Sequence, residues 1–143
     1  MASVDSISTL IHELSLLVSR AFSAETRAVG LTRTQWMILY TLHREGDLSQ
    51  SEIATKLSIA KQPLGKVVEQ LEAEGWVKRR RNALDKRAYV VSITGKVNRF
   101  IPSLYAVLKK IDELALEGVD EANKELLLTD LQRMKVNLKS VVG

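Results

Sequence analysis

The spacing of apolar residues predicts a chain that is mainly helical at both ends. From residue 3 to residue 28, apolar side chains recur every three or four positions, as on one face of a helix, and Gly30 ends this pattern. The same spacing returns over residues 94–141, where Gly118 divides it into two long helices. Because seams this regular typically pack against partner helices, we expect 3–30 and 94–141 to be the dimerisation helices of a homodimer. The alternative is an ordinary helical core within one chain.

Residues 31–93 carry the start and stop signals of shorter elements. Two capping boxes, in which Thr or Ser is followed three residues later by Gln or Glu, open the first two helices: Thr32 with Gln35, and Ser49 with Glu52. A third helix is expected from Lys61 to Glu74, before Gly75. The period then changes to two in "WVKRR" and "AYVVSIT", which predict the strands of a hairpin. We therefore expect one domain over 1–143, mainly α with a small β-hairpin wing, in which residues 31–93 form a winged helix-turn-helix lobe.

Positive charge gathers in the middle of the chain. The formal net charge is +4, but residues 56–99 hold eleven Lys or Arg against four acids. Residues 1–55 hold four Arg against six acids, and residues 100–143 hold six basic residues against seven. Within "KRRRNALDKRA", at 78–88, six cations accompany one acid. A localised basic patch concentrates phosphates. A solvated loop is the ordinary alternative, but the place of this stretch in the wing favours DNA.

In winged helix-turn-helix domains, one helix enters the major groove and the hairpin reaches the backbone or minor groove of DNA. Lys bonds to guanine or phosphate there and Gln to adenine, while a helix N-terminus holds phosphate. An acid among these cations, such as Asp85, is useful if it orients a neighbouring arginine. The predicted DNA-binding residues are Ser49, Gln50, Lys61, Gln62, Pro63, Gly65, Lys66, Arg80, Arg81, Asp85, Lys86 and Arg87.

Gly65 stands inside the helix expected from Lys61, where glycine costs about 1 kcal/mol relative to alanine. Two explanations remain open. The bare backbone allows close approach of DNA, or the position packs tightly against a neighbouring element.

Four stretches, "GLTRTQWMILYTL", "LSQSEIATKL", "LEAEGWVKR" and "DKRAYVVSIT", resemble the MarR/SlyA-type transcriptional regulators over nearly the whole chain. The most specific element is a wing signature, here Asp85, Arg87 and Thr94. Two positions depart from the family pattern. Gly95 follows Thr94 at once, where the family often has two residues before Gly or Ala. Gln62 and Pro63 stand where small hydroxyl residues are common, so an operator sequence cannot be borrowed from relatives.

This resemblance implies a homodimer with interlocking terminal helices that binds a pseudo-palindromic double-stranded DNA operator. It implies that the helix from Lys61 reads the major groove and that Arg87, held by Asp85, reaches the minor groove. Most members are repressors, and many release DNA on binding small phenolic or other anionic compounds. The candidate residues for such a ligand are His12, Arg20, Trp36 and Tyr40. The alternative is that Trp36 and Tyr40 are core residues.

Other function classes find little support in the sequence. We expect no metal or cofactor, because there is no cysteine and His12 and His43 lack the spacing of metal ligands. Catalytic motifs are absent, which argues against an enzyme. No apolar run approaches 18 residues and no signal peptide is evident, so we expect a cytoplasmic protein that does not enter the membrane. An architectural DNA-binding protein of low sequence specificity remains the alternative function.

Overall fold

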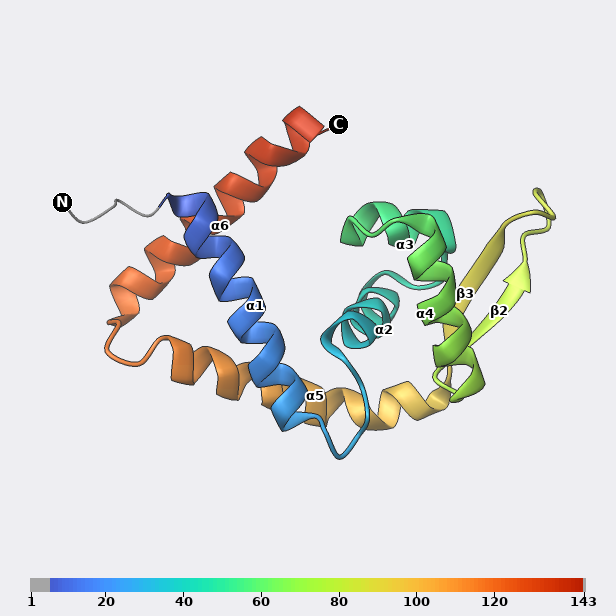
Figure 1. The fold of residues 1–143 in the computed structure, drawn as a ribbon, viewed down its shortest axis with the longest axis horizontal. Coiled ribbons are helices and arrows are strands. Elements are labelled where there is room, and N and C mark those ends of the chain that lie inside the picture. Colours follow the sequence, from blue (N-terminus) through green and yellow to red (C-terminus); the bar gives the residue numbers. More distant parts are fainter. Residues whose placement is uncertain (1–5, 143) are drawn as a thin grey trace. The chain divides into compact units, whose positions relative to one another are not determined.

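The computed structural model describes residues 6–142, and the chain forms two compact units, one ending at Leu108 and one beginning at Lys109. Positions 3 to 5 of the expected first helix lie outside the described residues. The elements are α1 (Ile7–Glu25), α2 (Arg33–Glu45), β1 (Leu48–Ser49), α3 (Gln50–Leu57), α4 (Lys61–Ala73), β2 (Val77–Arg81), β3 (Tyr89–Ile93), α5 (Gly95–Ala115) and α6 (Glu121–Val142) (Figure 1). The prediction of a mainly helical fold with a small β wing is confirmed.

Helices α2 and α3 begin at the two predicted capping boxes. The Thr32 hydroxyl accepts a hydrogen bond from the Gln35 N–H at 3.2 Å, and the Gln35 side chain accepts one from the Thr32 N–H at 2.9 Å. Ser49 and Glu52 repeat this exchange at 3.0 and 3.4 Å. Both boxes satisfy backbone donors that a helix start leaves without a partner. Helix α4 ends just before Gly75, whose φ of +82° suits glycine best.

Strands β2 and β3 form the predicted antiparallel hairpin, with Arg81 opposite Tyr89. The sheet has a third strand that the sequence did not predict, because β1 pairs with β3 through Leu48 and Val91. A strand of two residues is too short to show a period-two pattern. It matters for the site, since Ser49 belongs to β1 and also caps α3. The start of α3 is thus tied directly to the wing.

The first unit has its own apolar core. Side chains from α2, α3, α4, β2, β3 and the first half of α5 are at most 2% exposed: Trp36, Ile38, Leu39, Leu42, Ile53, Leu64, Val68, Leu71, Val77, Val91, Val97 and Leu104. Full burial of one such side chain contributes about 1.5–3 kcal/mol. Beside this core, the rings of Trp76 and Phe100 meet edge to face at 5.2 Å and join the residue before β2 to α5. The lobe that carries α3, α4 and the wing is therefore held rigidly.

The terminal helices are covered far less. Helix α1 buries only Phe22, and α6 has no buried residue. Each of the following apolar side chains is at least 37% exposed: Ile7, Leu10, Ile11, Leu14, Leu16 and Leu17 on α1, and Leu126, Leu127, Leu128, Leu131, Val136, Leu138, Val141 and Val142 on α6. Exposed apolar side chains in such numbers are typical of an interaction surface.

Candidate nucleic-acid interface

Helix α4 has one buried apolar face and one exposed polar face. Leu64, Val68 and Leu71 are fully buried, so the helix is fixed against the core. The exposed residues of its first half are Lys61, Gln62, Pro63 and Lys66, and all four are among the residues predicted to bind DNA. The N-cap residue, Ala60, supplies no side-chain hydrogen bond, so the first backbone N–H groups of α4 have no capping partner. Such a helix start suits a negatively charged ligand.

The first turns of α3 and α4 meet the end of the wing around one small pocket of about 130 Å³. Its lining comes from three parts of the chain: Ser49, Gln50, Ser51, Lys61, Arg87, Ala88 and Tyr89. The pocket thus brings together four of the residues predicted to bind DNA. The lining includes two cations and no acid, which gives the pocket a positive potential. The Ser49 hydroxyl oxygen already accepts the hydrogen bond that caps α3. At the pocket it can still donate one hydrogen bond and accept another.

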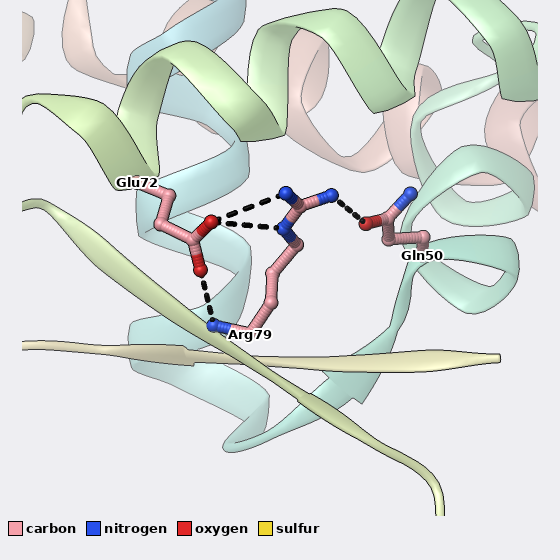
Figure 2. A network of polar contacts seen from close by, with 3 residues as sticks. All are labelled: Gln50, Glu72 and Arg79. Carbon is pink, nitrogen blue, oxygen red and sulfur yellow. Dashed lines mark hydrogen bonds and ion pairs between the residues drawn. The ribbon is translucent and has the colours of Figure 1, made fainter. Parts of the chain in front are cut away.

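A network of polar contacts lies beside this pocket (Figure 2). Arg79 on β2 donates to Glu72 on α4 from its backbone N–H at 2.9 Å, from Nε at 3.3 Å and from Nη2 at 3.1 Å. Its Nη1 donates to the side-chain oxygen of Gln50 at 3.4 Å. The hydrogen bonds and the charge of Arg79 lower the pKa of the Glu72 carboxyl. Arg79 was not among the residues predicted to bind DNA, and its one signal in the sequence was its place with Glu72 in "LEAEGWVKR".

Neighbouring arginines on β2 point to opposite faces of the sheet, as strand geometry requires. Arg79 and Arg81 lie over the ring of Tyr89, at 4.9 and 5.3 Å from its centroid. Arg80 instead pairs with Asp47 at 3.0 Å and donates to the Ser92 hydroxyl at 2.9 Å. The structure therefore places Arg80 apart from the other predicted DNA-binding residues, and its charge is partly balanced by an acid.

The tip of the wing is exposed and is shaped by its own short contacts. The Asp85 carboxylate accepts a hydrogen bond from the backbone N–H of Arg87 at 3.1 Å and lies 3.6 Å from the Arg87 Nε. The Arg87 side chain is 95% exposed. Lys86 is exposed, and its carbonyl accepts a hydrogen bond from Arg81. The contact that sequence reasoning proposed between Asp85 and Arg87 is present, although an ion pair this exposed stabilises little.

The space around Gly65 bears on the two explanations that its sequence position left open. A Cβ built at Gly65 would lie 3.7 Å from Nε2 of Gln50, which is ordinary van der Waals contact, and no other neighbour lies within 4 Å. Packing within the chain therefore does not require glycine here. The close-packing explanation loses its support, and an approach from outside remains.

The part of the chain that forms this interface is also the part that matches a known family. A model of the MarR family matches residues 31–89, which span the two capping boxes, α4, β2 and the tip of the wing as far as Tyr89. An HTH-type transcriptional regulator of Bacillus subtilis (strain 168), YwoH, is 28% identical over 119 residues, which are 81% of this chain and 86% of that protein. Over residues 31–89, the chain is therefore similar to the MarR family.

Solved structures of MarR family regulators show the same fold. A crystal structure of MarR matches with a TM-score of 0.93 at 20% identity, over 99% of this chain and 96% of that one. The structure of reduced AbfR bound to DNA matches with a TM-score of 0.75 at 19% identity, over 96% and 92% of the two chains. Family and fold are those of transcriptional regulators and not of enzymes.

Thr94, the threonine of the wing signature, closes the base of the hairpin. The Thr94 hydroxyl donates to the carbonyl of Gly75 at 2.7 Å, and its backbone N–H donates to the carbonyl of Trp76 at 3.1 Å. Lys96 donates to the carbonyl of Glu74 at 2.8 Å and lies 4.1 Å from the Trp76 ring centroid. Thr94 thus joins the end of β3 to the turn after α4, and α5 begins directly at Gly95.

An aromatic cluster of Phe22, Trp36, Tyr40 and Tyr105 lies in the first unit. Trp36 is fully buried and contacts the other three rings at centroid distances of 6.3, 5.6 and 6.4 Å. Its indole Nε1 is the one buried side-chain polar atom without a hydrogen-bond partner in the described part of the chain. Trp36 is thus a core residue, as the alternative reading of the sequence expected, whereas Tyr40 is only half-buried.

The cation beside this cluster is not the one considered from the sequence. Arg44 lies over the Tyr40 ring at 5.5 Å. His12 and Arg20 are exposed on α1, and over residues 6–142 no hydrogen bond, ion pair or ring contact joins either of them to the cluster. Their role with a ligand stays a prediction.

Nowhere between residues 6 and 142 do three or more His, Asp or Glu side chains gather as metal ligands. None of the helices described is both long and apolar enough to cross a membrane.

Proposed function

We propose that this protein is a homodimeric regulator of transcription that binds double-stranded DNA sequence-specifically at a pseudo-palindromic operator. The observation that carries the proposal is the acid-free pocket where the starts of α3 and α4 meet the wing, with Lys61 and Arg87 in its lining. Three elements that present donors and positive charge to one point suit the phosphate backbone of DNA.

Each element takes a separate part in this proposal. Helix α4 enters the major groove, where Gln62 and Lys66 reach base edges and Pro63 keeps the helix start narrow. The start of α3 holds a phosphate through Ser49 and Gln50. Arg87, Lys86 and Arg81 follow the adjacent backbone or minor groove, with Asp85 orienting Arg87. The DNA complex of AbfR, a structure of the same fold, supports this use of the fold.

The homodimer rests on the terminal helices. The exposed leucines and valines of α1 and α6 have no cover within the described chain, and a second copy of the same helices would bury them. Two lobes in one dimer would then read two half-sites related by a two-fold axis.

Regulation by a small molecule is the finer part of the proposal. From the family resemblance, we propose a cytoplasmic repressor that releases DNA on binding a phenolic or other anionic compound. The aromatic cluster around Trp36 and Tyr40 offers ring faces and an indole donor without a partner, and Arg44 offers a cation. His12 and Arg20 are kept as candidates because α1 lies in contact with α2, which carries Trp36.

The test is binding to the DNA just upstream of the protein's own gene, compared with a scrambled duplex of equal length across a salt series. We expect tight binding to the upstream duplex alone, with a loss of about 1–3 kcal/mol for each mismatched base pair. Equal and steeply salt-dependent binding to both duplexes would favour the alternative, an architectural protein of low specificity. No binding to either would contradict the proposal.

A further inference from the structure

Arg79 differs from the other cations of the basic stretch because it is turned inward. Its side chain is only 18% exposed, while that of Arg80 is 60% exposed and that of Arg87 is 95% exposed. The ring of Tyr89 covers one face of its guanidinium at 4.9 Å. Glu72 balances its charge at 3.1 Å. A guanidinium that is enclosed and neutralised in this way is a poor ligand for phosphate.

One nitrogen of the Arg79 guanidinium donates no hydrogen bond to Glu72. Nε and Nη2 both donate to Oε1 of Glu72, and the backbone N–H donates to Oε2. The remaining nitrogen, Nη1, points to the first residue of α3 and donates to the side-chain oxygen of Gln50 (Figure 2). Glu72 therefore fixes the guanidinium, and the guanidinium in turn meets Gln50, which is 29 residues away in the sequence.

This contact decides which end of the Gln50 amide faces outward. With Oε1 towards Arg79, the NH2 group lies on the side of α4, near Gly65, at the edge of the positive pocket. The opposite orientation would set amide N–H groups against guanidinium N–H groups and leave both without an acceptor. DNA phosphates and most base edges of the grooves offer acceptors, so an NH2 group is the useful end.

We propose that Arg79 is a positioning residue for DNA recognition, which holds the Gln50 amide so that its NH2 group donates to DNA. The inference rests on the proposed function, because it assigns a residue to the interface proposed above. It makes Arg79 part of the recognition apparatus without direct contact to DNA. Glu72 is the second member of the device, since it anchors the guanidinium.

The test is a double-mutant cycle of Arg79→Lys and Gln50→Ala, measured on a duplex that the wild-type protein selects from a random pool. Lysine keeps the charge but cannot reach Glu72 and Gln50 together. In the wild-type background we expect Arg79→Lys to weaken binding by roughly five- to tenfold, within the range of coupled neighbours. In the Gln50→Ala background the same change should cost less than about twofold, because the amide to be positioned is gone.

Arg80→Met is the matched control. Arg80 is the next residue of β2, and its partners are Asp47 and Ser92 on the other face of the sheet. Its effect on binding should be the same in both backgrounds. If Arg79→Lys lowers the melting temperature too far for binding to be measured, Glu72→Gln, which releases the guanidinium from its anchor, replaces it in the cycle with the same expected coupling.

The outcomes separate this inference from the proposed function. Equal losses for Arg79→Lys in both Gln50 backgrounds would show a structural brace and overturn the inference alone. For Arg79→Met, a slope of log affinity against log salt that is shallower by about 0.9 would show that Arg79 contacts a phosphate directly. That result would also overturn the inference. A wild-type protein that selects no duplex would overturn the proposed function and the inference together.

Discussion

The winged lobe and the terminal helices differ in how far one chain completes them. In the lobe, α2, α3, α4 and the sheet share one core, and the polar side chains that remain outside gather where α3, α4 and the wing meet. In α1 and α6 many leucine, isoleucine and valine side chains are exposed, and only Phe22 of the two helices is buried. The first region has a complete apolar core and presents polar side chains to a polar ligand. The second region exposes apolar side chains that the described chain leaves uncovered. In our proposal the first surface binds DNA and the second binds another copy of the chain.

The largest expected effect comes from removal of the apolar half-interface. Deletion of the chain from Leu126 onward should give monomer or insoluble protein, because the surface that we propose for dimerisation is lost. Size-exclusion chromatography with light scattering measures this. The control is Gln132→Glu, which adds one charge at an exposed polar position of α6 and should leave the dimer intact. A soluble, folded dimer after the deletion would remove α6 from the interface.

Loss of the wing cation should affect binding and not folding. For Arg87→Ala we expect operator affinity to fall by about 1–3 kcal/mol, the range for a good base contact, because our proposal places this side chain against the DNA backbone or in the minor groove. The melting temperature should not change, since the side chain is 95% exposed. Binding titrations and thermal melts are made on the same preparation. If operator affinity and melting temperature fall together, Arg87 contributes to the stability of the fold. The wing would then not be a surface used for DNA alone.

Replacement of Gly65 should move stability and binding in opposite directions. Gly65→Ala should stabilise α4 by up to about 1 kcal/mol, since helix propensity improves and the new methyl group meets only ordinary contact. DNA affinity should fall, because the methyl group lies on the face that approaches the groove. Urea unfolding and DNA titration measure the two effects. A variant that is more stable and binds equally well would show that DNA does not approach this backbone.

The smallest effect concerns pH. The hydrogen bonds from Arg79 lower the pKa of Glu72 in the folded state, so the stabilisation that they give is present above the ordinary pKa of a glutamate. It is lost as the pH falls through the lowered value. Glu72→Gln should therefore lose less stability than the wild type between pH 7 and pH 3 in urea unfolding. An equal loss in both proteins would show that Glu72 contributes nothing to acid sensitivity.

Features whose cause is local were open to prediction from the sequence. Thr32 with Gln35, and Ser49 with Glu52, act within one helical turn, so their spacing alone was enough to place the starts of α2 and α3. Period-two alternation placed the hairpin, and regular apolar spacing picked out the terminal helices that prove exposed. The two residues of β1 were missed because they pair only once β3 lies beside them.

Features that depend on distant partners were not open to prediction. In "KRRRNALDKRA" the cations look alike, yet Arg79 is held by Glu72, Arg80 by Asp47, and Arg87 is exposed. The partner of each arginine depends on the face of the strand to which its side chain points and on acids up to 33 residues away in the sequence. The cation beside Tyr40 is Arg44, one turn along the same helix. It was missed because Arg20, an arginine on another helix, was considered instead.

The most direct test of the account is a hydroxyl-radical footprint on the duplex that the wild-type protein selects. We expect two protected half-sites related by a two-fold axis, with centres about one helical turn apart, since each lobe of a dimer presents one α4 and one wing. Uniform protection without boundaries, or a single protected half-site at saturation, would contradict the claim that the winged lobe reads DNA while the terminal helices join two copies.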